Sequence, residues 1–395
     1  MSLDSIKQRI GKVNARRQSL TYYPYFKSSD PLPAGRILVD GKSLLNMSSN
    51  DYLGLSFDKR VIEASQKATD KYGTSRCGSR LLNGTAKIHE EAEETLSAFF
   101  GKERTLRFSS GHQANLGLFQ SLLGRGDTLL LDKDCHASIY DGVALSGTSM
   151  ERFIHNDFYD AKSRFTRLDG APAILATEGI FSMDGSIPDL GELMRLFGEV
   201  ECLKVVDEAH SIGVLGSGKG AAAEFGVLSK IDILSGAFSK SLASVGGFIS
   251  ASSEIIKYIR DSARSLIFTA APAPSAVAAA MKALEILSSE PERVISLRGK
   301  IGWFKAELGK IGVSADNPGS PIIPLRIASP EMAFRACMNL MSKGFMLYPI
   351  IPPASPQGIC MIRISITESH TKEDLSRFIA AIDELKISEY LLETA

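Results

Sequence analysis

Residues 203–210 read LKVVDEAH, and residues 231–241 read IDILSGAFSKS. Each segment opens with a short apolar run of the length expected for a buried strand. The first run ends in Asp207, and the second is followed by Lys240. In open parallel α/β sheets, ligands bind beyond the carboxyl ends of the strands. The two segments therefore predict a parallel sheet that carries an acidic and a basic side chain at its ligand-binding edge.

Two further apolar runs are also followed by a polar side chain. His136 follows residues 129–132, and Glu178 follows residues 173–177. A lysine and an aspartate at two strand ends are what pyridoxal phosphate (PLP) needs. The amine forms a Schiff base with the aldehyde, and the carboxylate keeps the pyridine nitrogen protonated. A lysine after a strand is usually a surface lysine, but the small residues 243–247 indicate a tight polar turn suited to a phosphate. We therefore expect PLP as the cofactor.

The other residues of this edge each have an ordinary structural alternative. Asp207 and His210 are also typical of a helix cap followed by a structural histidine, and His136 of a packed core histidine. Ser110 and Gly111 begin a predicted helix, where backbone N–H groups can meet a phosphate or simply be capped. The sequence leaves both interpretations open.

Two arginines are candidates for binding an anionic substrate. Arg80 closes the glycine-rich loop 73–80, where it meets either a substrate or a surface carboxylate. Arg363 alternates with apolar residues on a predicted strand, so its partner is either a protein carboxylate or the carboxylate of an amino acid, held by two parallel hydrogen bonds.

The pattern along the chain predicts an α/β protein. From about residue 46 to 285, short apolar runs alternate with helical patterns such as 86–100, which indicates a mostly parallel sheet covered by helices. We expect an N-terminal arm over 1–45, a large domain over 46–285 and a smaller α+β domain over 286–395. At 395 residues, more than one core is expected.

Composition excludes several classes of protein. Lys+Arg and Asp+Glu both total 45, so no global positive field is available to collect nucleic acid or an anionic membrane. The five cysteines are scattered without a C-x-x-C pair, which argues against a disulfide framework or a zinc site and fits a reducing cytosol. Because no signal peptide or membrane span is evident, we expect a cytoplasmic protein without an integral membrane segment.

Seven ordered segments together resemble the α-oxoamine synthases, a branch of the fold-type-I PLP enzymes. These segments are SNDYLGL at 49–55, NGT at 83–85, HAS at 136–138, HND at 155–157, EGIFSMDG at 178–185, DEAHS at 207–211 and TESHT at 367–371. The resemblance implies an aspartate-aminotransferase-like fold with a mostly parallel central sheet and a smaller C-terminal domain.

The resemblance also implies a role for each candidate residue. Lys240 would form the Schiff base, Asp207 would hold the pyridine nitrogen, His136 would stack on the ring, and His210 would lie near its phenolic oxygen. The other residues expected at the cofactor are Ser110, Gly111, His112, Ser182, Ser239, Ser241 and Thr269. The residues expected at the substrates are Asn50, Arg80, His155 and Arg363. Thr269 would reach the phosphate across a dimer interface, which implies a homodimer with shared active sites.

The implied reaction is a decarboxylative condensation of an L-amino acid with an acyl-CoA. The segments 77–85 and 238–248 are most like the branch that joins L-serine to palmitoyl-CoA and gives 3-ketodihydrosphingosine. The segments 155–157 and 178–185 are equally typical of the branch that joins L-alanine to a pimeloyl thioester for biotin. Two departures from the family pattern are His112, where relatives often carry an aromatic residue, and Ile351, where they often carry arginine. A PLP aminotransferase and an inactive PLP-fold subunit are the alternatives from other classes.

Overall fold

The computed structural model describes residues 3–18, 23–168, 173–314, 319–352, 355 and 358–392. The chain divides into two compact units. The larger unit comprises Ser49–Pro324 and Ile364–Ser376, and the smaller unit comprises the chain up to Ser48, Leu325–Arg363 and the chain from Arg377 onward. The division into an arm and two domains, with boundaries at residues 45 and 285, stays a prediction.

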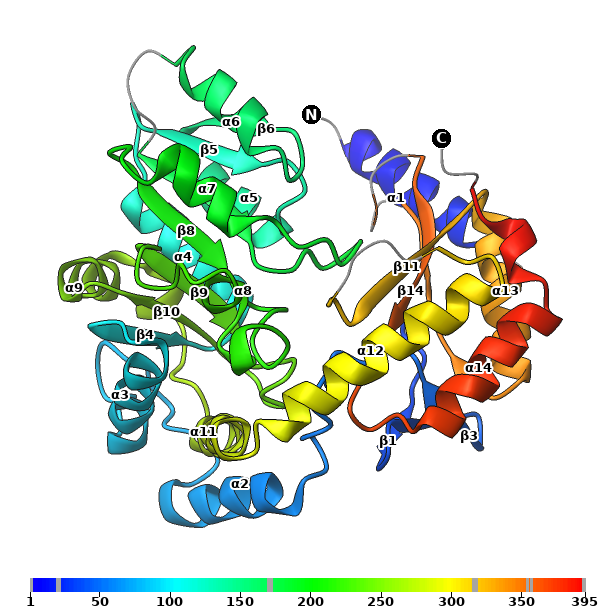
Figure 1. Cartoon of the computed structure of the whole chain (residues 1–395). Helices are drawn as coiled ribbons and strands as arrows, with labels where there is room; N and C mark the ends of the chain where they lie inside the picture. Colours follow the sequence, from blue (N-terminus) through cyan, green and yellow to red (C-terminus); the bar gives the residue numbers. More distant parts are fainter. Residues whose placement is uncertain are drawn as a thin grey trace. The chain divides into compact units, whose positions relative to one another are not determined.

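The larger unit is built on a seven-stranded sheet of order β4-β10-β9-β8-β7-β5-β6 (Figure 1). Its strands are β4 (Arg104–Phe108), β5 (Thr128–Asp132), β6 (Ser149–Phe153), β7 (Ile174–Glu178), β8 (Leu203–Asp207), β9 (Ile233–Ala237) and β10 (Gly247–Ala251). The pairs from β6 across to β9 are all parallel, whereas β10 is antiparallel to both β9 and β4. The expected mostly parallel sheet is confirmed.

Helices precede, separate and follow these strands along the chain. They are α2 (Lys59–Tyr72), α3 (Lys87–Phe100), α4 (Gly111–Leu122), α5 (Ala137–Ser146), α6 (Phe158–Phe165), α7 (Leu190–Phe197), α8 (Ala221–Glu224), α9 (Ser253–Ser262), α10 (Arg264–Ile267), α11 (Pro274–Ser289), α12 (Glu292–Lys310) and the short η1 (Gly216–Gly218). Several begin at a side chain that accepts a backbone N–H, such as Ser110 before α4 and Asp157 before α6. Such caps satisfy N–H groups that have no partner within the helix.

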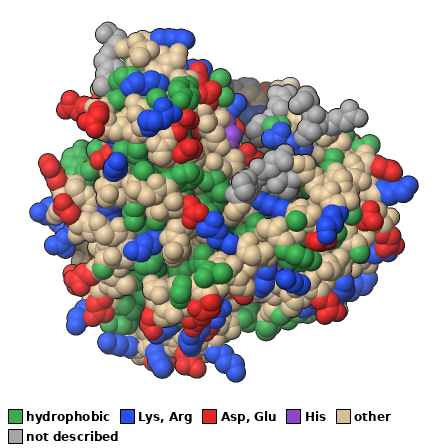
Figure 2. Space-filling view, viewed as in Figure 1, with side chains coloured by type: hydrophobic (Ala, Val, Ile, Leu, Met, Phe, Trp, Pro, Cys, Tyr) green, Lys and Arg blue, Asp and Glu red, His purple; other side chains and the backbone are tan. Residues whose placement is uncertain are grey.

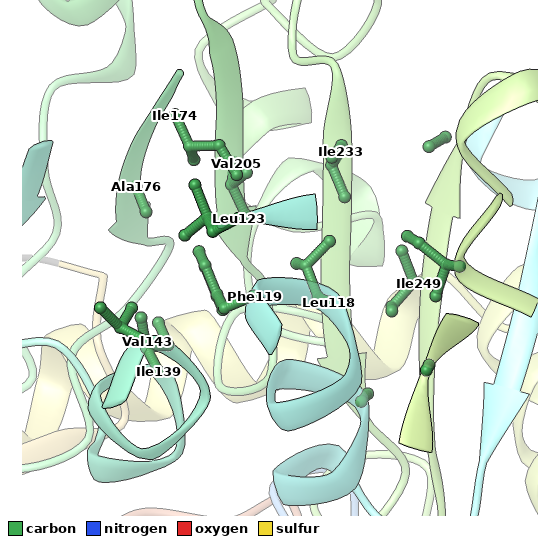
Figure 3. Close-up of a cluster of buried hydrophobic side chains, with 14 of the residues drawn as sticks. Leu118, Phe119, Leu123, Ile139, Val143, Ile174, Ala176, Val205, Ile233 and Ile249 are labelled. Carbon is green, nitrogen blue, oxygen red and sulfur yellow. The ribbon is translucent and has the colours of Figure 1, made fainter. Parts of the chain in front are cut away.

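The core of this unit fixes α4 against the sheet. Figure 3 shows Leu118 and Phe119 of α4 pointing toward Val205 on β8 and Ile233 on β9, and all four side chains are buried. α5 adds apolar side chains to the same cluster. Since α4 begins at the carboxyl edge of the sheet, this packing also holds its first turn at the predicted ligand-binding edge.

The smaller unit has two small sheets. One has the order β1-β2-β3-β12 and the other β11-β14-β13. Their strands are β1 (Asp30–Leu32), β2 (Arg36–Val39), β3 (Lys42–Asn46), β11 (Ile322–Ile327), β12 (Phe345–Met346), β13 (Pro349–Ile350) and β14 (Cys360–Ser365). The helices are α1 (Leu3–Gln18), α13 (Pro330–Ser342), α14 (Lys372–Glu384) and η2 (Ile387–Tyr390). β11, β14 and α14 each cross the division between the units.

The surface mixes charges of both signs. On the face shown in Figure 2, basic and acidic side chains lie interspersed among hydrophobic ones, as the balanced composition leads one to expect. Among the described helices, none combines the length and the apolar character needed to cross a membrane.

We predict that Leu118→Ala destabilises the protein by about 2–5 kcal/mol, because it leaves a cavity between α4 and the sheet. The control is Leu145→Ala, because Leu145 is 65% exposed. This substitution is expected to change the free energy of unfolding by less than about 0.5 kcal/mol. Urea unfolding of both variants measures the difference. Equal losses at the two positions would show that α4 is not anchored by this cluster.

Candidate active site

Lys240 lies in the turn that links β9 to β10. The turn is closed by backbone hydrogen bonds from Ala243 N to Lys240 O (2.9 Å) and from Ser244 N to Phe238 O (2.9 Å). It also lies against the start of α4, because a Cβ added to Gly247 would be 2.6 Å from the backbone nitrogen of Gly111. Only a residue without a side chain allows this approach, so the glycine of the turn brings Lys240 and the first turn of α4 together.

Asp207 ends β8 with a carboxylate that is held at both oxygens. Its Oδ2 accepts a hydrogen bond from Asn115 Nδ2 at 2.7 Å, and its Oδ1 accepts one from the backbone N–H of Ala209 at 2.9 Å. In the sheet register, Asp207 pairs with Glu178 on β7 and with Ser235 on β9. The side chain is buried, so its direction is fixed before any ligand binds.

His136 lies close enough to both groups for their charges to act on it. Its Nδ1 is 2.8 Å from Ser138 Oγ, and its backbone N–H donates to Glu178 Oε1. Burial lowers the pKa of His136. The nearby carboxylate of Asp207 raises that pKa, and the ammonium group of Lys240 lowers it. The imidazole is therefore neutral at pH 7, and the charges of Lys240 and Asp207 both act on it.

Glu178 is the second carboxyl group of this edge. Burial, and then the charge of Asp207, raise the pKa of Glu178 well above its usual range. Two adjacent carboxyl groups in a buried site cannot both ionise cheaply. We therefore interpret Glu178 as a carboxyl group that keeps its proton well above its usual pKa range.

His210 is held by a tyrosine. Its Nδ1 is 2.8 Å from the hydroxyl of Tyr52, which is wholly buried, and the same hydroxyl donates to Asn50 Oδ1 at 3.3 Å. Asn50 and Tyr52 both belong to the segment 49–55. The structure thus brings Asn50 and His210 into one hydrogen-bonded chain.

The first turn of α4 forms a cradle for an anion. Its cap is Ser110, whose Oγ accepts the N–H of Gln113 at 3.1 Å, and a Cβ on Gly111 would lie 2.7 Å from the Cβ of Ala237. Ser241 lies in the same turn as Lys240 and is 2% exposed, yet its Oγ has no hydrogen-bond partner within the described residues. A buried hydroxyl without a partner is costly. Together with a helix N-terminus, it fits a bound phosphate.

The remaining cofactor candidates lie around this cradle. Thr269 Oγ1 is 3.4 Å from Gln113 Nε2, so Thr269 lies beside the α4 of its own chain. His112 is exposed on that helix, with its Nε2 3.4 Å from Asp141 Oδ2. Ser239 directly precedes Lys240, and Ser182 lies after β7. Their roles at a cofactor stay predictions.

The substrate candidates have protein partners. Arg80 forms two parallel hydrogen bonds with the carboxylate of Glu93, at 2.8 and 3.1 Å. His155 bridges Asp132 (Nδ1 to Oδ1, 3.0 Å) and Ser186 (Nε2 to Oγ, 2.7 Å). Burial lowers the pKa of His155, but hydrogen bonds to Asp132 and Asp184 outweigh it and raise the pKa to about 10. Arg363 lies on β14 in the smaller unit. Substrate binding by these residues stays a prediction.

Sequence reasoning missed Asn115 and the hydroxyl of Tyr52. Asn115 is 2% exposed and joins Asp207 to Ser138, whose Oγ accepts from the same Nδ2 at 3.0 Å. A signal was present, because Asn115 stands one turn after Gly111 among apolar neighbours that face the core. A buried amide at such a position requires polar partners.

Known proteins resemble this chain over most of its length. The family model described as "Aminotransferase class I and II" matches residues 42–382. A serine palmitoyltransferase of Sphingobacterium spiritivorum is 40% identical, over 96% of this chain and 96% of its own length. A putative 8-amino-7-oxononanoate synthase of Desulforudis audaxviator is 38% identical, over 96% of this chain and 97% of its own length.

Solved structures agree with these relatives. A serine palmitoyltransferase structure with a PLP internal aldimine superposes with a TM-score of 0.92 at 32% identity, covering 98% of this chain and 100% of that chain. The resemblance to α-oxoamine synthases and the aspartate-aminotransferase-like fold are thereby confirmed.

We predict that Glu178→Gln stabilises the protein increasingly as the pH rises above about 4.5. The unfolded chain loses the proton of Glu178 near that pH, whereas the folded chain keeps it to a higher pH, so folding costs about 1.4 kcal/mol more for each pH unit in between. Glutamine carries no such cost, and its side-chain oxygen can still accept the N–H of His136.

The measurement is urea unfolding of the wild type and Glu178→Gln between pH 4.5 and 8, with Glu254→Gln at an exposed position of α9 as the matched control. A constant difference across this range would mean that Glu178 is ionised in the folded protein.

Proposed function

Because the chain belongs to the aminotransferase class I and II family, we propose that it is a PLP-dependent acyltransferase that condenses L-serine with palmitoyl-CoA. The products are 3-ketodihydrosphingosine, CoA and carbon dioxide. The observation that carries the proposal is the convergence of Lys240, Asp207 and His136 at one strand edge, next to a cradle for a phosphate. Serine and palmitoyl-CoA are supported as the substrates by two relatives. They are the serine palmitoyltransferase of Sphingobacterium spiritivorum, at 40% identity, and the serine palmitoyltransferase structure with a PLP internal aldimine, at 32% identity.

Each residue of the site has a part in this reaction. When bound, PLP supplies an aldehyde that reacts with amines and a ring that accepts electrons from bonds at the substrate α-carbon. Asp207, fixed by Asn115, would hold the pyridine nitrogen, and neutral His136 would cover one face of the ring. His210, fixed by Tyr52, would lie near the phenolic oxygen.

Lys240 would hold the cofactor and move protons. It would attach the cofactor through its Nζ and then, once released, take the α-proton of the amino acid. The start of α4 and the hydroxyl of Ser241 would bind the phosphate. Arg363 would bind the amino acid carboxylate through two hydrogen bonds, and His155 would lie at the acyl substrate.

A second function has a relative in its favour. The putative 8-amino-7-oxononanoate synthase is almost as similar as the serine palmitoyltransferase, so alanine with a pimeloyl thioester is the alternative pair. A spectral titration with serine, alanine and glycine separates these amino acids. CoA release from acyl-CoAs of different chain length then identifies the acyl donor, and an amino acid conversion without CoA release would indicate an aminotransferase.

We also propose that the active enzyme is a cytoplasmic homodimer. Ala271 N donates to Gly78 O at 2.9 Å, which places Phe268 near the loop that carries Leu81 and Leu82. These three apolar side chains are exposed. A second copy that covers them would meet Thr269, which is expected to contact the cofactor of the partner. All five cysteines are free, as a reducing compartment leads one to expect.

We predict that Lys240→Ala abolishes the visible absorption band of the bound cofactor and lowers turnover by about 10²–10⁴-fold or more, because both the attachment point and the proton carrier are lost. Absorption spectra and CoA release measure the two effects. The control is Lys257→Ala at an exposed position of α9, which is expected to keep the band and the activity. A retained band with wild-type turnover in Lys240→Ala would remove the basis of the proposed function.

We predict that Phe268→Asp converts the dimer to a monomer and lowers activity together with it, because a charge cannot be buried unpaired in an interface. Analytical ultracentrifugation gives the mass, and Leu145→Asp provides a control at another exposed apolar residue. If Phe268→Asp stays dimeric and active, the interface lies elsewhere.

A further inference from the structure

The N-terminal helix α1 buries none of its described side chains. Leu3, Ile6, Ile10 and Val13 are 63, 47, 56 and 69% exposed. A helix of 16 residues is marginally stable in water unless an apolar face packs against something. In α1 the apolar residues face outward, so within the described chain the helix lacks the packing that normally stabilises such a segment.

The four apolar side chains form one stripe. Their spacing of three, four and three residues places them within an arc of about 80° on a helix that turns about 100° per residue. By the same geometry Lys7 flanks the stripe on one side and Arg9 on the other. The helix contains five basic residues (Lys7, Arg9, Lys12, Arg16 and Arg17) against a single acidic one, Asp4. α1 is thus a narrow apolar stripe with basic edges.

The charges decide which partner fits. The stripe has the spacing of a coiled coil, in which Lys7 and Arg9 would occupy the two flanking positions. A second parallel copy of α1 would offer neither cation an acidic partner, because the single acidic residue of the helix, Asp4, lies outside these flanking positions. A surface of anionic lipids offers the opposite charge, and a helix with an apolar stripe and basic edges is suited to lie in the headgroup region.

We propose that α1 binds the enzyme reversibly to bilayers rich in anionic lipids, with Leu3, Ile6, Ile10 and Val13 inserted between the headgroups. Lys7 and Arg9 contact the lipid phosphates from either side. With only four apolar side chains, the binding is weak and depends on salt. The inference stands independently of the cofactor chemistry. It would bring the enzyme to the surface into which a long-chain acyl thioester partitions.

Flotation of the PLP-loaded full chain with lipid vesicles tests the proposal. Binding is expected with phosphatidylglycerol mixed into phosphatidylcholine, but not with phosphatidylcholine alone, and is expected to fall as salt is added. The double variant Ile6→Asn, Ile10→Asn is expected to weaken binding by at least about tenfold. The matched control is Leu145→Asn with Tyr258→Asn, two apolar side chains exposed in the larger unit, and is expected to bind as the wild type.

A second pair of variants tests the charges. Lys7→Glu with Arg9→Glu is expected to abolish binding to the anionic vesicles, whereas Lys230→Glu with Lys257→Glu, also exposed, changes the net charge equally and is expected to bind more nearly as the wild type. Circular dichroism and the cofactor spectrum confirm that each variant is folded.

Two outcomes overturn the proposal. One is wild-type protein that fails to float with anionic vesicles, or floats equally well as the Ile6→Asn, Ile10→Asn variant. The other is an Ile6→Asn, Ile10→Asn variant whose mass falls in ultracentrifugation while its vesicle binding is unchanged. That result would show that the apolar stripe contacts another protein chain. Because binding is read out without turnover, a failure of the proposed catalytic function leaves this result interpretable.

Discussion

The register of three parallel strands is the constraint on which the site depends. β7, β8 and β9 pair so that Glu178, Asp207 and Ser235 lie side by side at one edge of the sheet. A slip of one residue in any pair would turn a carboxyl group to the opposite face. Both faces of these strands are buried, so such a slip would also break the packing of the core. The same strand register therefore determines both the stability of the sheet and the position of the polar side chains at its edge.

Burial then determines the charge of each group. In a site with little water, an ionised group persists only where it has a partner of opposite charge or several hydrogen bonds. Asp207 has two fixed donors, from Asn115 and Ala209. Glu178 has the backbone N–H of His136 and lies beside the charge of Asp207, so the proton resides on Glu178. The edge thus presents the carboxyl groups of Asp207 and Glu178, the neutral imidazole of His136 and the amine of Lys240, which are the groups expected at the proposed cofactor site.

The sequence predicted the parts of this arrangement that are local. Strand ends are marked by apolar runs, so Asp207, Lys240, His136 and Glu178 could be placed on one edge of a parallel sheet. The helix at 86–100 follows from the spacing of its apolar residues. The contact from Asn115 to Asp207 joins residues that are 92 positions apart, and its partner depends on how α4 packs on the sheet. No local pattern encodes that distance.

The same limit applies to the arginine and histidine assigned to the substrates. The motif segments identified Arg80 and His155, but only the folded chain shows that Glu93 and Asp132 meet them. The exposure of α1 is also visible only in the folded chain. From its sequence, an amphipathic helix is usually expected to cover a core. Whole-chain neutrality does not oppose a basic helix at a membrane, since attraction between charges in solution extends only about 8 Å at physiological salt. At that range, a membrane surface interacts with the local charges of α1 rather than with the net charge of the whole chain.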